Sequence, residues 1–167
     1  YYILTIFEER VNKKNLPFFL SLMLSCNKKK ICCPEPILDT KGKLTNNFNQ
    51  KKIAIFSFLD GKSKKNWTEL NCFDLGKRLG QFHSINRSFK EKISNEFSLV
   101  FWKKIFKKMD RSKLDSVIPG IHNLLKKELD IINLNWPKDL PKGIIHADLF
   151  PDNIFFKGKK ISGILDF

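Results

Sequence analysis

The sequence predicts an α+β fold with two lobes. Segments rich in β-branched, aromatic and apolar residues fall mainly before residue 60, whereas apolar residues at helical spacing dominate from there to about residue 135. A pair of short apolar segments around a Lys-Gly turn at residues 157–160 closes the chain and predicts a β-hairpin. We therefore expect a small sheet-containing lobe over residues 1–59 and a mainly helical lobe, carrying the hairpin, over residues 60–167.

The first lobe is expected to begin with a strand and a helix. Residues 1–7 are β-branched, aromatic and mostly apolar, which predicts a buried strand. Apolar side chains then recur at spacings of three, one and three, which is typical of a helix, and Pro17 is compatible with its first turn. These apolar residues are Leu16, Phe19, Leu20 and Met23.

A second apolar strand is predicted at the end of the first lobe. Two prolines interrupt residues 31–38, so we expect an edge strand or a connector there. Gly and Asn residues within residues 40–47 predict a hairpin-like loop. Residues 53–59 predict the apolar strand, which ends at Asp60. Gly61 then indicates a turn, beyond which the composition becomes helix-like. This turn is the predicted boundary between the lobes.

Beyond this boundary, apolar residues follow the period of amphipathic helices in three stripes. A helix face of this width must be buried to be stable in water, so we expect the stripes to form core and not a ligand site. His83 and His122 lie on or near these helices and are expected to be structural or surface residues. The stripes are Leu75, Leu79 and Phe82; Trp102, Ile105, Phe106 and Met109; and Ile121, Leu124, Leu125, Leu129 and Ile132.

The residues most informative about function lie between these helices and the hairpin. His146, Asp148 and Asn153 have the spacing His-x-Asp with an Asn five residues after the Asp. This is the spacing of a kinase catalytic loop, in which the Asp accepts the proton of the attacking hydroxyl and the Asn holds a metal ion. We expect His146 to hydrogen-bond the backbone and orient Asp148, and not to act directly as an acid or base.

A second carboxylate is expected beside this loop. Asp166 ends the apolar strand of residues 161–165 and is suited to hold the Mg²⁺ that bridges nucleotide phosphates, because a hard cation prefers oxygen ligands. An ordinary turn at residues 152–153, a capping role for Asp148 and a solvated strand end at Asp166 are the alternative interpretation. The apolar strands that enter and leave the loop favour the kinase interpretation.

Several segments resemble the aminoglycoside phosphotransferase superfamily and, within it, the homoserine kinases of that fold. Residues 145–153 and 162–167 carry the resemblance to the superfamily. Residues 4–8, 16–20 and 57–61 resemble the early strand, the following helix and the linker between lobes in those homoserine kinases. The resemblance covers nearly the whole chain and is weakest in its middle. It implies a protein-kinase-like fold with ATP and Mg²⁺ bound between the lobes.

The resemblance also implies a set of contacts and a substrate. In that family, backbone groups of the linker hydrogen-bond adenine, which here indicates Ser57, Phe58 and Leu59, and apolar neighbours such as Ile55 would cover the base. The implied substrate is L-homoserine, phosphorylated on its side-chain hydroxyl in threonine biosynthesis, in the cytoplasm. Family members begin earlier and continue beyond the metal-binding Asp, so we expect a partial chain whose activity alone and oligomeric state stay open.

One feature of the wider family does not occur in this sequence. Related phosphotransferases carry a Lys or Arg on the strand of residues 1–7 and a Glu on the next helix to hold it, whereas this chain has Thr5 on the strand and no acidic residue over 11–26. Homoserine kinases also tend to show Leu-Thr at this strand, so the difference is compatible with activity. Arg10 is the nearest arginine that could reach the phosphates.

Two other classes of function stay open. One is a different small-molecule kinase of the same fold, acting on choline, ethanolamine, methylthioribose or an aminoglycoside. Its acceptor pocket would need carboxylates for a cationic substrate, whereas homoserine needs a cation for its carboxylate and an acid for its amine. The other is a noncatalytic ATP-binding or nucleic-acid-binding module. The intact Asp148, Asn153 and Asp166 argue against such a module.

The formal charge of +14 would normally suggest a nucleic acid or an anionic membrane as partner. However, only four of the thirty-one basic residues are arginine, the side chain preferred for phosphate and base recognition, and the lysines are scattered. We therefore expect no specific nucleic-acid partner. A signal peptide and an apolar run of about 18 residues are both missing, so no membrane partner is expected. The four cysteines lack metal-ligand spacing.

Overall fold

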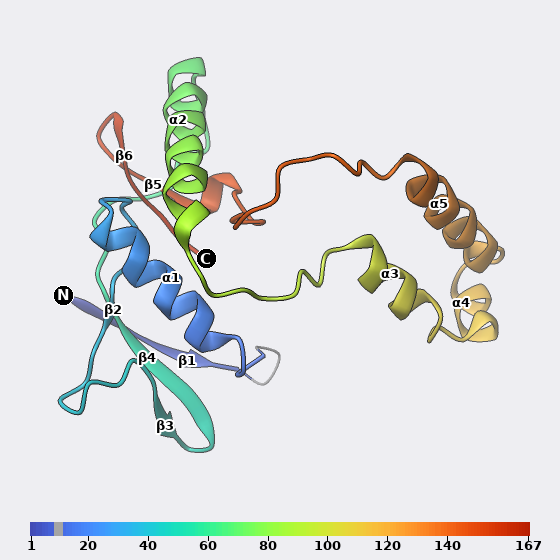
Figure 1. Ribbon diagram of the computed structural model, residues 1–167, viewed down its shortest axis with the longest axis horizontal. Coiled ribbons are helices and arrows are strands. Elements are labelled where there is room, and N and C mark those ends of the chain that lie inside the picture. The colour runs from blue at the N-terminus through green and yellow to red at the C-terminus, as the bar shows by residue number, and fades with distance from the viewer. Residues whose placement is uncertain (9–11) are drawn as a thin grey trace. The chain divides into compact units, whose positions relative to one another are not determined.

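The computed structural model describes residues 1–8 and 12–167. The chain forms two compact units. One, here called the sheet unit, comprises residues 1–92 and 143–167, and the other, the helical unit, comprises residues 93–142. Strands and helices occur in the order that the sequence predicts for an α+β chain (Figure 1). The predicted boundary at residue 59 separates a sheet-containing lobe from a helical lobe, which is not the division into these two units. It stays a prediction.

The sheet unit is built around an antiparallel sheet. Its central strand is β4 (Lys51–Ser57), which pairs with β1 (Tyr2–Phe7) on one side and with β2 (Pro36–Ile37) on the other. A short strand, β3 (Asn46–Phe48), also pairs with β4. The edge strand expected within residues 31–38 is thus confirmed, whereas Asn46 and Asn47, expected in a loop, lie in β3. Paired asparagines can join a ladder because strand pairing uses only backbone groups.

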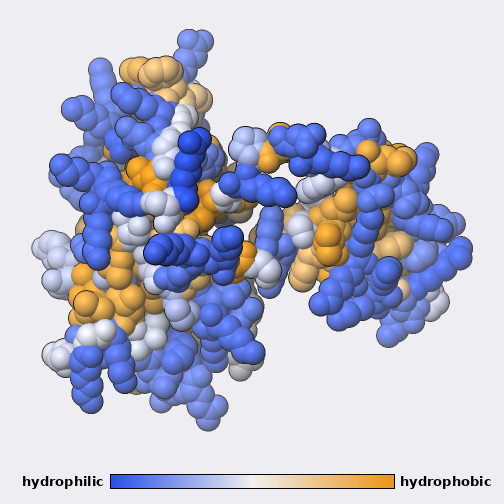
Figure 2. All heavy atoms as spheres, in the orientation of Figure 1, coloured by the Kyte–Doolittle hydropathy of each residue, from blue (hydrophilic) through white to orange (hydrophobic). Residues whose placement is uncertain are grey.

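The expectation that the first strand is buried is wrong. Tyr2 and Leu4 on β1 are 69% and 58% exposed. Side chains alternate between the faces of a strand, and the register places Leu4 opposite Ile55, which is itself exposed, on the face away from the buried Ala54. Figure 2 shows hydrophobic atoms at the surface around β2 and β4. An apolar sequence predicted the strand correctly but not how many of its faces are covered.

The predicted helix after β1 is confirmed as α1 (Leu16–Lys28), with Pro17 in its first turn. Its buried side chains include Leu20, Met23 and Cys26, and the helix packs against β2. Pro17 is tolerated there because the N–H groups of the first turn have no partner within the helix. All four cysteines are free thiols. Burial raises the pKa of the Cys26 and Cys33 thiols, so both behave as apolar core residues.

A long helix, α2 (Glu69–Ile85), connects this sheet to the second part of the sheet unit. It ends at a short 3-10 turn, η1 (Asn86–Ser88). Phe82 is buried as expected, and Arg78 donates from Nη2 to the carbonyl oxygen of Ile161 at 3.0 Å. Ile161 belongs to the predicted hairpin, which is confirmed as β5 (Ile154–Lys157) and β6 (Lys160–Ile164). The buried side chains of this hairpin core are Ile154, Phe156, Ile161 and Ile164.

The helical unit contains α3 (Leu99–Phe106), α4 (Arg111–Val117) and α5 (Ile121–Asn135). Trp102 on α3 makes an edge-on contact with Trp136, and Phe106 stacks on His122 of α5. The predicted stripes therefore face one another. However, none of the stripe residues of this unit is buried: Ile105, Met109 and Leu124 are exposed and the others are half-buried. The expectation that these two stripes form a buried core is therefore wrong. The helix α5 packs against both α3 and α4, and in a unit of three helices these contacts cover only part of each apolar stripe.

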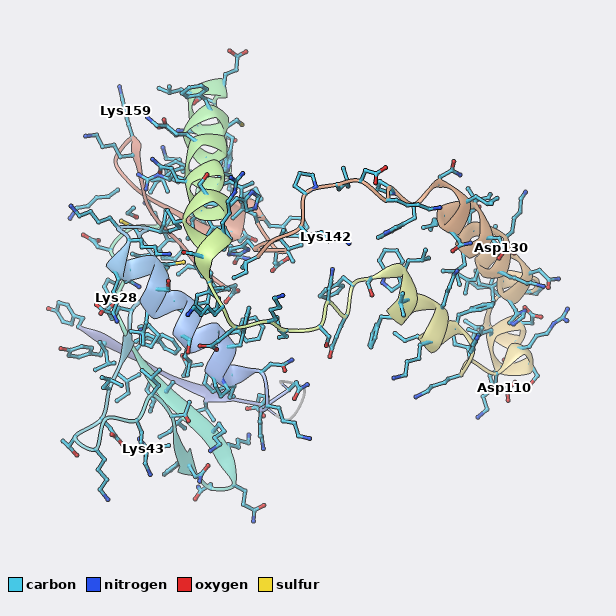
Figure 3. The ribbon with its side chains drawn as sticks, in the orientation of Figure 1. Lys28, Lys43, Asp110, Asp130, Lys142 and Lys159 are labelled. Carbon is cyan, nitrogen blue, oxygen red and sulfur yellow. The ribbon has the colours of Figure 1, made fainter. Side chains whose placement is uncertain are left out.

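Two further observations bear on partners. Among the residues that the structure describes, none of the helices has both the length and the apolar composition that a membrane span requires. The labelled lysines of the sheet unit, Lys28, Lys43 and Lys159, lie on α1, on a loop and on the hairpin turn (Figure 3). These three lysines thus lie on separate elements.

Candidate active site

The segment that follows residue 145 forms a tight, hydrogen-bonded loop in the sheet unit. The N–H of Phe150 donates to the carbonyl oxygen of Asp148 at 2.9 Å, and the N–H of Asn153 donates to that of Phe150 at 3.0 Å. A 3-10 turn, η2 (Pro151–Asn153), leads directly into β5. Ala147 has the left-handed φ of 68°, which is uncommon for a residue with a side chain and occurs often at functional sites.

His146 holds this loop against the end of the hairpin. Its side chain is only 9% exposed, and its Nε2 lies 2.7 Å from the carbonyl oxygen of Leu165. The N–H of Asp148 donates to Nδ1 at 3.4 Å, so the ring proton is on Nε2 and is donated to Leu165. Burial lowers the pKa of His146, although the Leu165 bond and the Asp148 and Asp166 carboxylates oppose this effect. The neutral imidazole therefore orients Asp148 through its backbone.

Asn153 connects the two ends of the loop. Its side-chain Nδ2 donates to the backbone oxygen of Asp148 at 2.8 Å and to the Asp148 carboxylate Oδ2 at 3.1 Å. Its backbone oxygen accepts a hydrogen bond from the N–H of Leu165 at 2.8 Å. The amide nitrogen thus fixes the orientation of both side chains, and the amide oxygen Oδ1 remains as a ligand for a cation.

Asp166 follows directly after the strand end that His146 and Asn153 bind. Its backbone has a left-handed φ of 56°, and its side chain is exposed. The next ring, that of Phe167, lies 5.0 Å from the His146 ring and 5.6 Å from that of the buried Phe82. Phe167 therefore anchors the segment after the carboxylate, and the backbone bonds of Leu165 anchor it before. The structure thus brings the four loop and hairpin residues of the predicted site together.

The predicted linker lies at the end of β4 in the same unit. The N–H of Ser57 donates to the carbonyl oxygen of Glu35 at 2.9 Å, and that of Phe58 donates to Tyr1 at 3.1 Å. The N–H of Leu59 has no hydrogen bond to any residue that the structure describes. Of the three linker N–H groups, that of Leu59 is therefore the one without a partner among the described residues. Ile55 is exposed on the face of β4 that it shares with Leu4 of β1.

The whole chain, residues 1–167, matches the family model described as the phosphotransferase enzyme family. The chain belongs to this family. The homoserine kinases of Rhodopseudomonas palustris (strain CGA009) and Rhizobium rhizogenes (strain K84) are 41% and 40% identical to it, over 100% and 99% of this chain. The matched part is 51% of each relative. The chain therefore spans about half the length of the curated relatives it matches.

Solved structures show the same fold. The amicoumacin kinase hAmiN in complex with AMP-PNP, Ca²⁺ and Ami has a TM-score of 0.68 at 18% identity, over 99% of this chain and 51% of that one. Spectinomycin phosphotransferase in complex with ADP and spectinomycin has a TM-score of 0.58 at 20% identity, over 99% and 55%. At these identities the likeness concerns the fold alone. It confirms the predicted α+β, protein-kinase-like fold class.

The side-chain oxygens of Asn153 and Asp166 fit Mg²⁺ better than a transition metal. In residues 1–8 and 12–167, no three His, Cys, Asp or Glu side chains gather as a metal cluster. Mg²⁺ does not require such a cluster, because it is usually held by one or two protein oxygens together with substrate phosphates and water. Asn153 Oδ1 and the exposed Asp166 carboxylate are oxygens of that kind. A nearby cation would also favour the orientation in which Asn153 turns its nitrogen towards Asp148.

Among the residues that it describes, the structure does not identify a basic residue that would hold the phosphates. Thr5 on β1 lies opposite Ala54 and is half-buried, and it cannot supply a charge. Arg10 lies outside the described residues. Sequence reasoning also missed the roles of Phe167 and of the Leu165 backbone. An apolar strand end with an aromatic residue directly after the carboxylate is a signal that could have indicated the first of these.

Proposed function

We propose that the full-length protein transfers the γ-phosphoryl group of ATP to the side-chain hydroxyl of L-homoserine. The proposal is supported by the names of the relatives, which are about 40% identical over nearly all of this chain. The single structural observation that carries it is the side-chain bond from Asn153 Nδ2 to Asp148 Oδ2 at 3.1 Å. This bond gives one carboxylate a fixed orientation in a loop with the spacing of a phosphotransfer site.

Asp148 is proposed as the catalytic residue. The acceptor hydroxyl oxygen forms a bond to the γ-phosphorus as the bond from that phosphorus to the β–γ bridging oxygen breaks, and ADP leaves. The hydroxyl proton passes to the Asp148 carboxylate. Because the transition state involves little covalent work by the protein, the main contributions are positioning and charge stabilisation. The hydrogen bonds from Asn153 and His146 keep the carboxylate in place before the acceptor arrives.

Asn153 and Asp166 are proposed to hold Mg²⁺, which when bound neutralises the charge of the phosphates. Leu59 is proposed to donate its backbone N–H to adenine, with Ser57 and Phe58 setting the direction of the linker and Ile55 lying against the base. His146 stays neutral and acts only on the position of Asp148. A soluble amino-acid substrate and ATP place the reaction in the cytoplasm.

A coupled assay of ADP release tests this proposal. The full-length protein is supplied with MgATP and, separately, with L-homoserine, choline, ethanolamine, methylthioribose or an aminoglycoside. Homoserine should be the best acceptor by kcat/KM, and the product should be O-phosphohomoserine by mass spectrometry. Turnover of choline without turnover of homoserine would reject the substrate but keep the kinase. Binding of ATP with no turnover of any acceptor would favour a noncatalytic nucleotide-binding module.

The positive charge is proposed to have no specific nucleic-acid function. The labelled lysines of the sheet unit lie on separate elements and not in one stripe (Figure 3). Any binding to DNA or RNA should be weak, indifferent to sequence and lost steeply between about 0.05 M and about 0.2 M salt, where counterion release is large. Titration of two labelled oligonucleotides of different sequence at both salt concentrations tests this. Sequence-selective binding that survives the higher salt would contradict it.

A further inference from the structure

The linker after β4 lies directly on the β5–β6 hairpin. The N–H of Lys62 donates to the carbonyl oxygen of Phe156 at 3.1 Å, and the N–H of Phe156 donates back to Lys62 at 2.9 Å. Asp60 and Lys157 form an ion pair at 2.5 Å. The two segments are almost a hundred residues apart in sequence. The linker is thus joined to the hairpin whose second strand, β6, ends two residues before Asp166.

Gly61 makes this close approach possible. Its φ of +133° is one that residues with side chains rarely adopt. A Cβ atom at this position would lie 2.8 Å from the carbonyl oxygen of Phe156 and closer still to the hydroxyl of Ser162. Ser162 Oγ is buried and has no hydrogen-bond partner among the described residues. The backbone of Phe156 and the Ser162 side chain therefore occupy the space that a side chain at residue 61 would need.

Gly163 on β6 accommodates the linker in a second way. A Cβ atom there would lie 2.5 Å and 2.8 Å from the two methyl carbons of Leu59, and 3.1 Å from the carbonyl oxygen of Cys32. The same carbonyl accepts a hydrogen bond from the N–H of Ile164 at 3.0 Å, so this backbone cannot move away freely. The Leu59 side chain therefore packs directly on the backbone of Gly163, in the space that a side chain at residue 163 would fill.

We propose that Gly163 is a positioning residue for nucleotide binding, because its missing side chain sets the distance between the linker and Asp166. Leu59 carries the linker N–H that has no hydrogen bond to a described residue, and Gly163 lies three residues before the carboxylate proposed to hold Mg²⁺. This inference rests on the proposed function. A methyl group at residue 163 displaces the Leu59 side chain and changes the spacing between the adenine contact and the phosphate contact.

The test compares Gly163→Ala with two matched variants of the full-length protein. Gly143→Ala is the control, because a Cβ atom at Gly143 meets no atom within 4 Å. The double variant Gly163→Ala/Leu59→Ala removes the methyl groups that the new Cβ would strike. Dissociation constants for a fluorescent ATP analogue with Mg²⁺ are measured by titration, and KM values for ATP and homoserine by the coupled assay. Circular dichroism verifies that each variant is folded at the assay temperature.

Gly163→Ala should weaken nucleotide binding by about tenfold, as expected from overpacking of modest size. KM for ATP should rise by a similar factor, and KM for homoserine should change less than twofold, or roughly the scatter of a surface substitution. The double variant should recover part of the lost affinity, and Gly143→Ala should match the wild type. A structural role without positioning would lower the stability of Gly163→Ala and leave the nucleotide dissociation constant unchanged.

The inference would be overturned if the dissociation constant of Gly163→Ala for the ATP analogue lay within twofold of that of the Gly143→Ala control. If Gly163→Ala does not fold, Leu59→Ala is tested in its place. A linker without the Leu59 side chain that packs on Gly163 should also bind nucleotide more weakly. Wild-type affinity in Leu59→Ala would then overturn the inference. The titration needs no acceptor, so a wild-type protein that binds ATP but does not turn over homoserine rejects the proposed substrate and leaves this result intact.

Discussion

The sheet unit and the helical unit differ in how far they bury their apolar side chains. In the sheet unit, buried residues occur on α1, β4, α2 and both hairpin strands, and Ile154 is fully buried. In the helical unit, Leu99 is the one hydrophobic residue classed as buried, although α5 packs against both α3 and α4. Every residue proposed for the site lies in the sheet unit. The site is thus located where long-range packing fixes side-chain positions.

This difference in burial separates the two kinds of sequence pattern. The spacing of His146, Asp148 and Asn153 produces a fixed arrangement of side chains in the sheet unit, whereas the apolar spacing in the helical unit produces only helices. The loop of residues 146–153 is fixed by two hydrogen bonds to Leu165, which follows the buried hairpin strand β6. The Leu165 carbonyl oxygen accepts from His146 Nε2, and the Leu165 N–H donates to the backbone oxygen of Asn153. In the helical unit, α3 and α4 have side-chain caps from Ser98 and Asp110, and α3 and α5 carry apolar stripes, but the stripes stay partly in water. Helix formation needs only local pattern, whereas site geometry needs a core.

The largest expected difference between the units is in the free energy of unfolding. Ile154→Ala removes a fully buried side chain and should cost about 2–5 kcal/mol, through lost transfer free energy and an unfilled cavity. Leu134→Ala on α5, where the leucine is 81% exposed, should stay within about 0.5 kcal/mol of the wild type. Urea denaturation measures both. Equal losses would mean that another part of the full-length protein covers α5.

The sequence allowed most element types and the loop residues to be predicted, because both depend on local pattern, but it did not indicate β3 or α4. Strand, helix and hairpin positions follow from periodicity and turn residues, and the spacing of Asp148 and Asn153 lies within one short loop. Exposure of β1 could not be predicted, because apolar residues mark a strand without showing what covers it. The pairing of the Ser57 and Phe58 N–H groups with Glu35 and Tyr1 could not be predicted either, because these contacts are distant in sequence.

A smaller effect is expected at the start of α2. Thr68 accepts a hydrogen bond from the N–H of Asn71, and the Asn71 side chain accepts one from the N–H of Thr68. Thr68→Ala should therefore cost about 1 kcal/mol, because two backbone donors lose or weaken their partners. Ser98→Ala at α3 is the matched variant of the helical unit and should cost about half as much, since its cap is a single bond. Urea midpoints at unchanged m-value measure both.

The ionisation of His146 should change the free energy of unfolding with pH by a still smaller amount. Burial lowers the pKa of His146 below its ordinary value of 6.5, so the unfolded chain binds a proton more readily than the folded protein. The stability contributed by the neutral imidazole is present above pH 6.5 and is lost as the pH falls through the folded pKa. His146→Gln should therefore lose less stability than the wild type between about pH 7.5 and about pH 5.5. Parallel urea midpoints in the two proteins would contradict this.

The separation of roles between Asp148 and Asp166 is tested most directly by titrating an ATP analogue into Asp148→Asn and Asp166→Asn with and without Mg²⁺. Asp148→Asn should keep near wild-type, Mg²⁺-dependent affinity while its kcat falls by at least about 10²-fold, the lower range for a positioned general base. Asp166→Asn should lose the increase in affinity that Mg²⁺ gives, as well as rate. Equal loss of Mg²⁺-dependent affinity in both variants would contradict the assignment of base to Asp148 and of metal ligand to Asp166.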